Sequence, residues 1–287
     1  MRALTTEHGL RTAAPQNMGV DSRYSWLRLG ITVLLGGIGG VGMWSVVVAL
    51  PAVQAEFGVA RAGASLPYTL TVLGLAAGGV LMGRAVDRFG VVRPLLVAVG
   101  ALTLGYIGSA FATSLWQFAA MQGLLIGLGC SATFGPLMAD VSHWFVQRRG
   151  IAVAICASGS YLAGAVWPPV VAHFIGSVGW RHTQIGIGVF CAASMLPLVL
   201  ALRRKSPIDL GTRVSTATAQ AGASLGLSSG TLQTLLFIAG IACCVAMAMP
   251  QVHIVPYCGD LGYGVARGAQ MLSLMLGFGI VSRVGSG

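Results

Sequence analysis

The feature that most constrains this chain is a long stretch without any charge. From Pro94 to Ala139 there is no Asp, Glu, Lys, Arg or His. As an α-helix rising about 1.5 Å per residue, this stretch would measure roughly 69 Å, enough to cross a ~30 Å hydrocarbon core twice. Over the whole chain only 8% of the residues are charged. A soluble domain cannot hide so much apolar surface, so the sequence predicts an all-α polytopic membrane protein.

Apolar segments of near-bilayer length follow one another along the chain. Closed β-barrels, the other structures that satisfy their backbone in lipid, use strands of about half this length. The 42 glycines allow helices to approach closely where apolar surface gives no drive to associate. We therefore expect eight transmembrane helices, at 29–51, 65–86, 94–113, 117–139, 150–175, 183–202, 231–254 and 268–287.

Two polar segments divide the chain. Residues 1–28 mix charged and polar groups without an apolar core, which predicts a cytoplasmic tail and not a cleavable signal peptide. Residues 203–230 begin with Arg-Arg-Lys and continue with Ser, Thr, Ala and Gly, which predicts a cytoplasmic linker. The linker would separate a six-helix bundle over 29–202 from two further helices over 231–287.

Basic residues indicate the orientation in the membrane. With the N-terminus in the cytoplasm, thirteen Lys and Arg fall on inner segments and three, Arg61, Arg181 and Arg267, on outer connectors. This is the bias of the positive-inside rule. The net charge of +10 therefore reflects topology, with anionic lipid as its partner, and does not indicate nucleic-acid binding. We expect a multi-pass protein of a bacterial inner membrane.

A short repeat suggests an internal duplication. Gly-Val-Ala-Arg occurs at 58–61, between the first and second helices, and again at 264–267, between the seventh and eighth. The two copies hold matching topological positions. Parallel six-helix repeats with a substrate between them are a known plan of transporters.

The connector after the second helix carries a charged motif, Gly-Arg-Ala-Val-Asp-Arg-Phe-Gly-Val-Val-Arg-Pro at 83–94. We expect Gly83 to permit close helix contact and Gly90 to permit a tight turn. Asp87 can face a helix N-terminus. Two basic residues could pair with acids on neighbouring helices, namely Arg88 and Arg93. The simpler alternative is a charged loop that only obeys the positive-inside rule.

This motif resembles the cytoplasmic signature loop of the major facilitator superfamily, although that family usually has basic residues where Val91 and Val92 stand. Segments 50–58, 65–68 and 148–152 are similar to the monocarboxylate and oxalate–formate carrier branch. Drug–proton antiporters of the superfamily usually carry an Arg in helix four, where this chain has Gln122-Gly123, and a Gly-Pro motif in helix five that it lacks. Drug export is disfavoured and not excluded.

The resemblance implies roles for two charged residues. Carboxylate carriers have an arginine at the place of Arg283 in helix eight, which implies that Arg283 grips a substrate carboxylate; the alternative is an arginine that snorkels to the headgroups. Asp140 would pair with Arg88 or Arg93 across the inner gate; the alternative is a helix-end acid in water.

Polar or amphipathic side chains within the helices could line a pathway. His253 and Tyr257 share a helix face, where they could line a cavity or sit at the membrane interface. Tyr68, Trp44 and Gln122 are weaker candidates, since each is more often a packing residue. The six cysteines have no metal-ligand spacing and are interpreted as small buried apolar residues.

The function we expect is secondary active transport of a small organic anion by alternating access, with a proton or a counter-anion as the coupled ion. No cofactor or metal is expected. The chain lacks H-E-x-x-H, G-x-S-x-G and paired intramembrane aspartates, which disfavours a membrane enzyme. A membrane scaffold without transport is the remaining alternative. Since the family plan has twelve helices, we expect Gly287 to be followed by four more in a full-length carrier.

Overall fold

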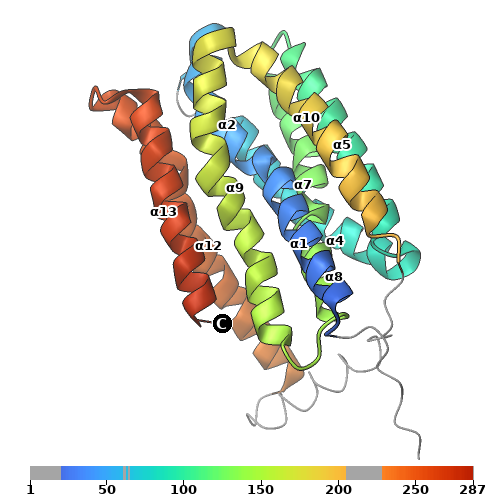
Figure 1. Cartoon of the computed structure of the whole chain (residues 1–287). Coiled ribbons are helices and arrows are strands. Elements are labelled where there is room, and N and C mark those ends of the chain that lie inside the picture. The colour runs from blue at the N-terminus through green and yellow to red at the C-terminus, as the bar shows by residue number, and fades with distance from the viewer. Residues whose placement is uncertain (1–20, 61–62, 64, 205–227, 287) are drawn as a thin grey trace, which may run out of the picture.

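The computed structural model describes residues 21–60, 63, 65–204 and 228–286, and within them every regular element is helical (Figure 1). In this described part of the chain, eight helical segments are long and apolar enough to cross a membrane. Chain order gives α1 (Arg23–Gly39), α2 (Val41–Phe57), α4 (Leu66–Phe89), α5 (Val92–Ala110), α6 (Leu115–Ala120), the π-helical η1 (Met121–Gly127), α7 (Leu128–Ala132), α8 (Gly135–Ser142), α9 (Arg149–Val178), α10 (Trp180–Ala201), α12 (Ser229–Asp260) and α13 (Gly264–Ser286).

The predicted spans two to six agree with the structure to within three residues at each end. The first is wrong at both ends, because α1 begins at Arg23 with Ser22 as its N-cap and α2 continues to Phe57. The tail predicted for residues 1–28 is therefore too long by its last six residues. The hydropathy pattern places the start of this span after Arg28, whereas in the structure Arg28 is buried and paired with an acid. Residues 205–227 lie outside the described part, so the linker at 203–230 stays a prediction.

Two of the spans are not continuous α-helices. The first is interrupted at Gly40, which separates α1 from α2. The fourth passes from α6 through the π-helix η1 to α7, turns at Thr133 and Phe134, and ends in α8. Backbone irregularity within a membrane is tolerated only where neighbouring groups satisfy it. Such neighbours are present here, as described below.

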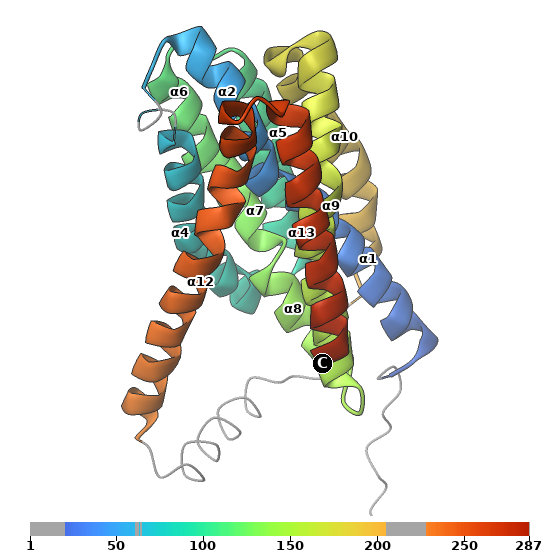
Figure 2. The ribbon, with the colours of Figure 1, turned by 90° about the vertical axis from the view of Figure 1, so that its left-hand side faces the viewer.

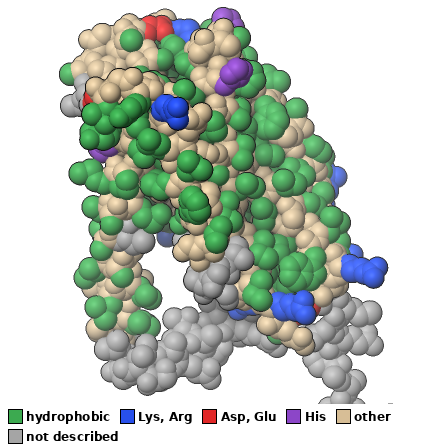
Figure 3. Space-filling model, turned by 60° about the vertical axis from the view of Figure 1, so that its left-hand side comes forward, with side chains coloured by type: hydrophobic (Ala, Val, Ile, Leu, Met, Phe, Trp, Pro, Cys, Tyr) green, Lys and Arg blue, Asp and Glu red, His purple; other side chains and the backbone are tan. Residues whose placement is uncertain are grey.

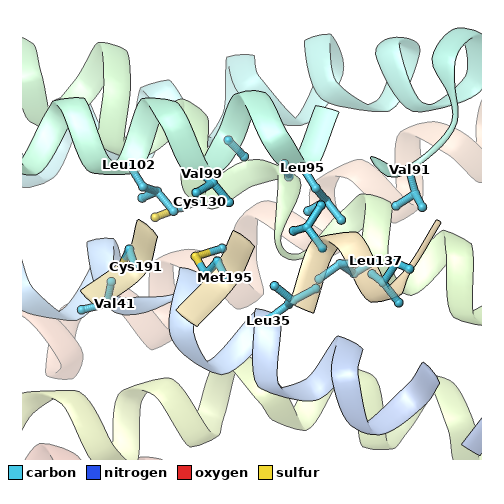
Figure 4. Close-up of a cluster of buried hydrophobic side chains, with 14 of the residues drawn as sticks. Leu35, Val41, Val91, Leu95, Val99, Leu102, Cys130, Leu137, Cys191 and Met195 are labelled. Atoms are coloured by element: carbon cyan, nitrogen blue, oxygen red, sulfur yellow. The ribbon is translucent and has the colours of Figure 1, made fainter. Parts of the chain in front are cut away.

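A buried apolar core joins the first six spans. Leu95, Val99 and Leu102 of α5 face Cys191 and Met195 of α10 across it (Figure 4), and Cys191, Met195, Leu95 and Leu102 have no exposed surface. Because packing and not the hydrophobic effect holds helices together in lipid, such interdigitation decides which helices are neighbours.

Glycines bring α4 unusually close to span four. A Cβ on Gly74 would stand 1.9 Å from the carbonyl oxygen of Gly123, and one on Gly127 would stand 2.6 Å from the carbonyl oxygen of Thr71. Each of the two helices carries two glycines four residues apart, at 74 and 78 in α4 and at 123 and 127 in span four. This is the small-xxx-small contact by which membrane helices pack backbone to backbone.

The last two spans lie on one side of the six-helix bundle, with α13 against α9 (Figure 1). The side chain of Leu276 packs against Gly164, and the ring of Tyr161 packs against Gly279. Pro169 has no N–H for the carbonyl of Ala165 four residues earlier. The hydroxyl of Ser273 in α13 donates to that carbonyl. The carbonyl of Ala165, which lacks its helical donor because of the proline in α9, is therefore hydrogen-bonded to α13.

The two ends of the molecule differ. One end, called the basic end here, carries Arg28, Arg84, Arg88, Arg93, Arg148 and Arg149; the opposite end is called the far end. At the far end α12 packs on α2 and α13, where Val255 and Cys258 are buried. Towards the basic end α12 leans away from the bundle (Figure 2), and a hollow separates this arm from the rest of the surface (Figure 3).

The two copies of the Gly-Val-Ala-Arg sequence both begin with a glycine of positive φ. Gly58 follows the end of α2 with φ 60°, and Gly264 is the first residue of α13 with φ 82°. Both values lie in the left-handed region that favours glycine. Arg61 is outside the described residues, so the match covers the first positions of the repeat.

Candidate transport pathway

An apolar cluster closes the far end between the six-helix bundle and the last two spans. Its buried members come from α2, the α5–α6 connector, α6, α10, α12 and α13: Val46, Val47, Ala49, Val53, Ala112, Phe118, Trp180, Val255, Leu272 and Leu276. Tyr68, at the start of α4, and Trp44 are partly buried against it. Tyr68 therefore lies in the closed far end of the structure.

A polar cluster fastens the outer rim of the same end. Arg181 donates from Nε and Nη2 to Oε1 of Glu56 at 3.1 and 2.7 Å, and the indole of Trp180 donates to Oε2. Arg181 also donates to the carbonyls of Ala110 and Ala112, at the C-terminal end of α5. The guanidinium of Arg181 thus connects the start of α10 with the ends of α2 and α5. Its positive charge also complements the negative C-terminal end of the α5 dipole.

The signature loop lies at the open basic end. Gly90 ends α4 with φ 76°, and its N–H donates to the carbonyl of Val86, as the predicted tight turn requires. Gly83 does not make the predicted close contact, since a Cβ there would meet nothing within 4 Å. Asp87 is exposed and lines, with Gly83, a hollow of about 270 Å³ between α4 and α8.

Arg88 and Arg93 are exposed and approach the ring of Phe89, at 5.3 and 6.0 Å from its centroid. Among the described residues, neither makes an ion pair with an acid. The pairing predicted between Asp140 and one of these arginines is therefore wrong for this conformation. The alternative of a solvated acid is wrong as well, because the Asp140 side chain is only 8% exposed.

The partner of Asp140 is Arg28. Nε and Nη2 of Arg28 donate to Oδ2 and Oδ1 of Asp140 at 2.7 and 2.9 Å, and the Arg28 side chain is 2% exposed. Its Nη1 donates to the carbonyls of Leu202 and Arg204, just after α10. The guanidinium also lies over Trp144, 4.7 Å from the ring centroid. A bidentate pair of this kind ties spans one, four and six together at the basic end.

The interruptions of spans one and four contact each other. A Cβ on Gly39 would stand 2.4 Å from Cγ2 of Thr133. Two side chains donate to the carbonyls before the break at Gly40: the indole of Trp167 to Gly37 at 2.8 Å and the thiol of Cys130 to Gly39 at 3.1 Å. Broken helices near the midplane are a recurring feature of transporter binding regions.

The remaining predicted site residues do not come together. Gln122 lies in η1 with no exposed surface, and among the described residues neither of its amide atoms has a hydrogen-bond partner. His253 lines a hollow of about 150 Å³ beside Leu50, Pro51 and Gln54 of α2. The backbone of Arg283 belongs to α13, and its side chain lies outside the described part.

Comparison with known proteins decides the family. The model of the Major Facilitator Superfamily matches residues 32–287. The chain belongs to the major facilitator superfamily. As such it is an integral, multi-pass membrane protein of a transporter family and not an enzyme.

Curated relatives place this major facilitator protein near the monocarboxylate branch. It is 28% identical over 211 residues to monocarboxylate transporter 12-B of Danio rerio, covering 64% of this chain and 44% of that protein. It is 30% identical over 203 residues to monocarboxylate transporter 13 of Bos taurus, covering 68% and 45%. It is 26% identical over 217 residues to the MFS-type transporter pytF of Aspergillus terreus, covering 74% and 70%.

The matched part of the chain spans less than half the length of these two monocarboxylate transporters. These relatives are animal and fungal, so the bacterial inner membrane remains a prediction without support from them. The described part of this major facilitator protein has an apolar cluster at the far end and one arginine–acid ion pair near each end.

Proposed function

We propose that this protein is a secondary active transporter of a small organic anion and works by alternating access. The observation that carries the proposal is the match of the major facilitator family to residues 32–287. The far end is sealed by the apolar cluster between α2, α12 and α13, while α12 leaves the bundle towards the basic end. Rocking of two bundles about a midplane site would exchange these states.

The substrate class rests on relatives and on one arginine. The names of the animal relatives say that they transport monocarboxylates. Arg283 lies in the span that packs along α9, and a guanidinium can hold a carboxylate with two parallel hydrogen bonds.

The coupled ion is a proton or a counter-anion. Within the described spans, the two fastening acids, Glu56 and Asp140, are both engaged with arginines near the helix ends. Neither lies near the middle of a span, where an intramembrane proton carrier would stand. Exchange against a second anion needs no such acid, and a proton carrier would have to lie outside the described spans.

The orientation we propose puts the basic end in the cytoplasm. The arginines of α4, α5 and α9 gather there, and the far end holds Arg181 and Arg267. This distribution follows the positive-inside rule. The open state of the structure would then face inward.

Uptake of radiolabelled pyruvate into proteoliposomes tests the proposal, using the protein as its gene encodes it. We expect saturable uptake that is accelerated by unlabelled pyruvate inside the vesicles. Arg283→Lys should lose most of this uptake, because an ammonium cannot replace the planar fork. Arg267→Lys, on the same helix at the far end, is the matched control. Absence of flux with correctly inserted protein would favour the scaffold alternative, and export of a cationic dye would favour the drug exporter.

A further inference from the structure

A deep groove opens on the flank of the bundle that faces away from α12 and α13. The tight turn at Gly179, with φ 84°, joins α9 to α10, and the two helices then diverge with α1 between them (Figure 1). The groove has a volume of about 730 Å³. Its floor is formed by Leu34, Gly37 and Ile38 of α1. We call it the α9–α10 groove.

The walls of the α9–α10 groove are apolar. Val166, Val170 and Phe174 line it from α9, and Ile187 and Phe190 line it from α10. Val166, Phe174 and Phe190 expose 47%, 49% and 47% of their surface, so large apolar side chains stand open along its length. An occupant must therefore be apolar where it touches these walls.

The polar groups within the groove are already bonded. The indole of Trp167 donates to the carbonyl of Gly37 at 2.8 Å, and the hydroxyl of Thr183 donates to the carbonyl of Gly179 at 2.8 Å. His182 stands at the far-end rim, exposed, with Nδ1 3.1 Å from the carbonyl of Val178. Water would find few partners here, since a stable buried water needs two to four polar groups.

The rest of the described chain leaves this groove uncovered. Helix α9 contacts α13 through Tyr161 and Gly164, whereas Ala163 and Val166 line the groove on its other face. Both walls belong to spans that cross the membrane, so the surrounding medium is lipid. The wall from Leu162 to Val178 is roughly 24 Å long, more than the ~15 Å half-thickness of the hydrocarbon core.

We propose that the α9–α10 groove binds an acyl chain of a bilayer phospholipid, from the leaflet at the far end, with its headgroup at the level of His182. The chain fills the wedge between α9 and α10 and rests on α1 beside Gly37, three residues before the break at Gly40. The bound lipid is thereby a structural ligand of the first six spans. This inference depends on membrane insertion and not on the transported substrate.

A variant that fills the groove tests this binding. A Cβ at Gly186, which lines the groove, meets nothing within 4 Å, so Gly186→Trp can place its ring in the space. Gly176→Trp is the matched control, because Gly176 is equally open and does not line the groove. Delipidated protein in mild detergent is titrated with palmitoyl-oleoyl-phosphatidylcholine and analysed by native mass spectrometry. We expect the wild type and Gly176→Trp to retain lipid, and Gly186→Trp to lose most of it. Equal retention by all three would overturn the proposal.

Photolabelling of the unmutated protein guards against misfolding of the variant. A phosphatidylcholine with a diazirine on its acyl chain should label the peptide around Val166 and Phe174 at low probe concentration, with competition by unlabelled phospholipid. Leu104 of α5, 64% exposed, reports the background of unspecific lipid contact. Labelling of the two regions to the same extent, without competition, would contradict a bound chain. So would a dimer whose interface protects the groove, since a second copy would then be the occupant.

Discussion

Asp140 holds the guanidinium of Arg28 with both carboxylate oxygens, at 2.7 and 2.9 Å, and neither side chain is more than 8% exposed. Removal of one partner leaves the other charge buried without compensation, which costs about 3–5 kcal/mol. We therefore expect Asp140→Asn to lower the thermal stability of the purified protein strongly. The double variant Arg28→Met with Asp140→Leu should recover much of the loss, because it buries no charge.

The second ion pair supplies the control. Arg181 and Glu56 are 35% and 40% exposed, and pairs of this kind contribute about 0–1 kcal/mol. Glu56→Gln should therefore shift the unfolding temperature much less than Asp140→Asn. Equal shifts for the two variants would show that burial does not set the strength of the Arg28–Asp140 pair.

The close approach of α4 to span four predicts opposite effects at two glycines of the same helix. Gly74→Ala places a methyl group 1.9 Å from the carbonyl oxygen of Gly123, so the helices must separate, at roughly 1–3 kcal/mol or more. Gly79→Ala meets nothing within 4 Å and gains about 0.5–1 kcal/mol from helix propensity. Unfolding monitored by tryptophan fluorescence in detergent checks both. A destabilised Gly79→Ala would contradict the contact geometry.

Asp87 should matter for transport and not for stability. It is exposed, and no ion pair joins it to another described residue, so Asp87→Asn should change the free energy of unfolding by no more than about 0.5 kcal/mol. If the loop is a gate, pyruvate flux through the complete gene product should nevertheless fall sharply. Arg84→Gln, also exposed and three residues earlier, is the control. Normal flux in Asp87→Asn would remove this residue from the gate.

The proposed orientation predicts one-sided labelling. Arg203→Cys at the basic end and Arg267→Cys at the far end are both exposed positions. A membrane-impermeant maleimide added to intact cells should modify Arg267→Cys alone, and Arg203→Cys should react only after the cells are permeabilised. The reverse pattern would invert the topology and turn the open end outward.

The sequence predicted the spans and the turn of the signature loop because each depends on local properties. Hydropathy over a bilayer length predicts spans two to six. A glycine at position 90 predicts a tight turn, and the structure has φ 76° there, in the region that favours glycine. The partner of Asp140 could not be predicted in this way. Arg28 is 112 positions away, and a hydropathy pattern does not show which distant acid an arginine at the start of a span would pair with.

Two further features had weaker signals. The cluster of Gly36, Gly37, Gly39 and Gly40 in the first span could have suggested the break, since glycine lowers helix stability. Gln122 was expected at a pathway because it is polar, and the structure instead encloses it in η1. Whether a polar residue faces a cavity or a bundle interior depends on the rotation of its helix, and a π-helical turn changes that rotation.

The two faces of α9 have a mechanical consequence. Gly164 lies against Leu276 of α13, while Val166, two residues later and 47% exposed, lines the α9–α10 groove. If the proposed transport cycle and the proposed lipid binding both hold, the second bundle and the bilayer act on opposite sides of α9. We then expect membrane thickness and lateral tension to affect transport together with substrate concentration.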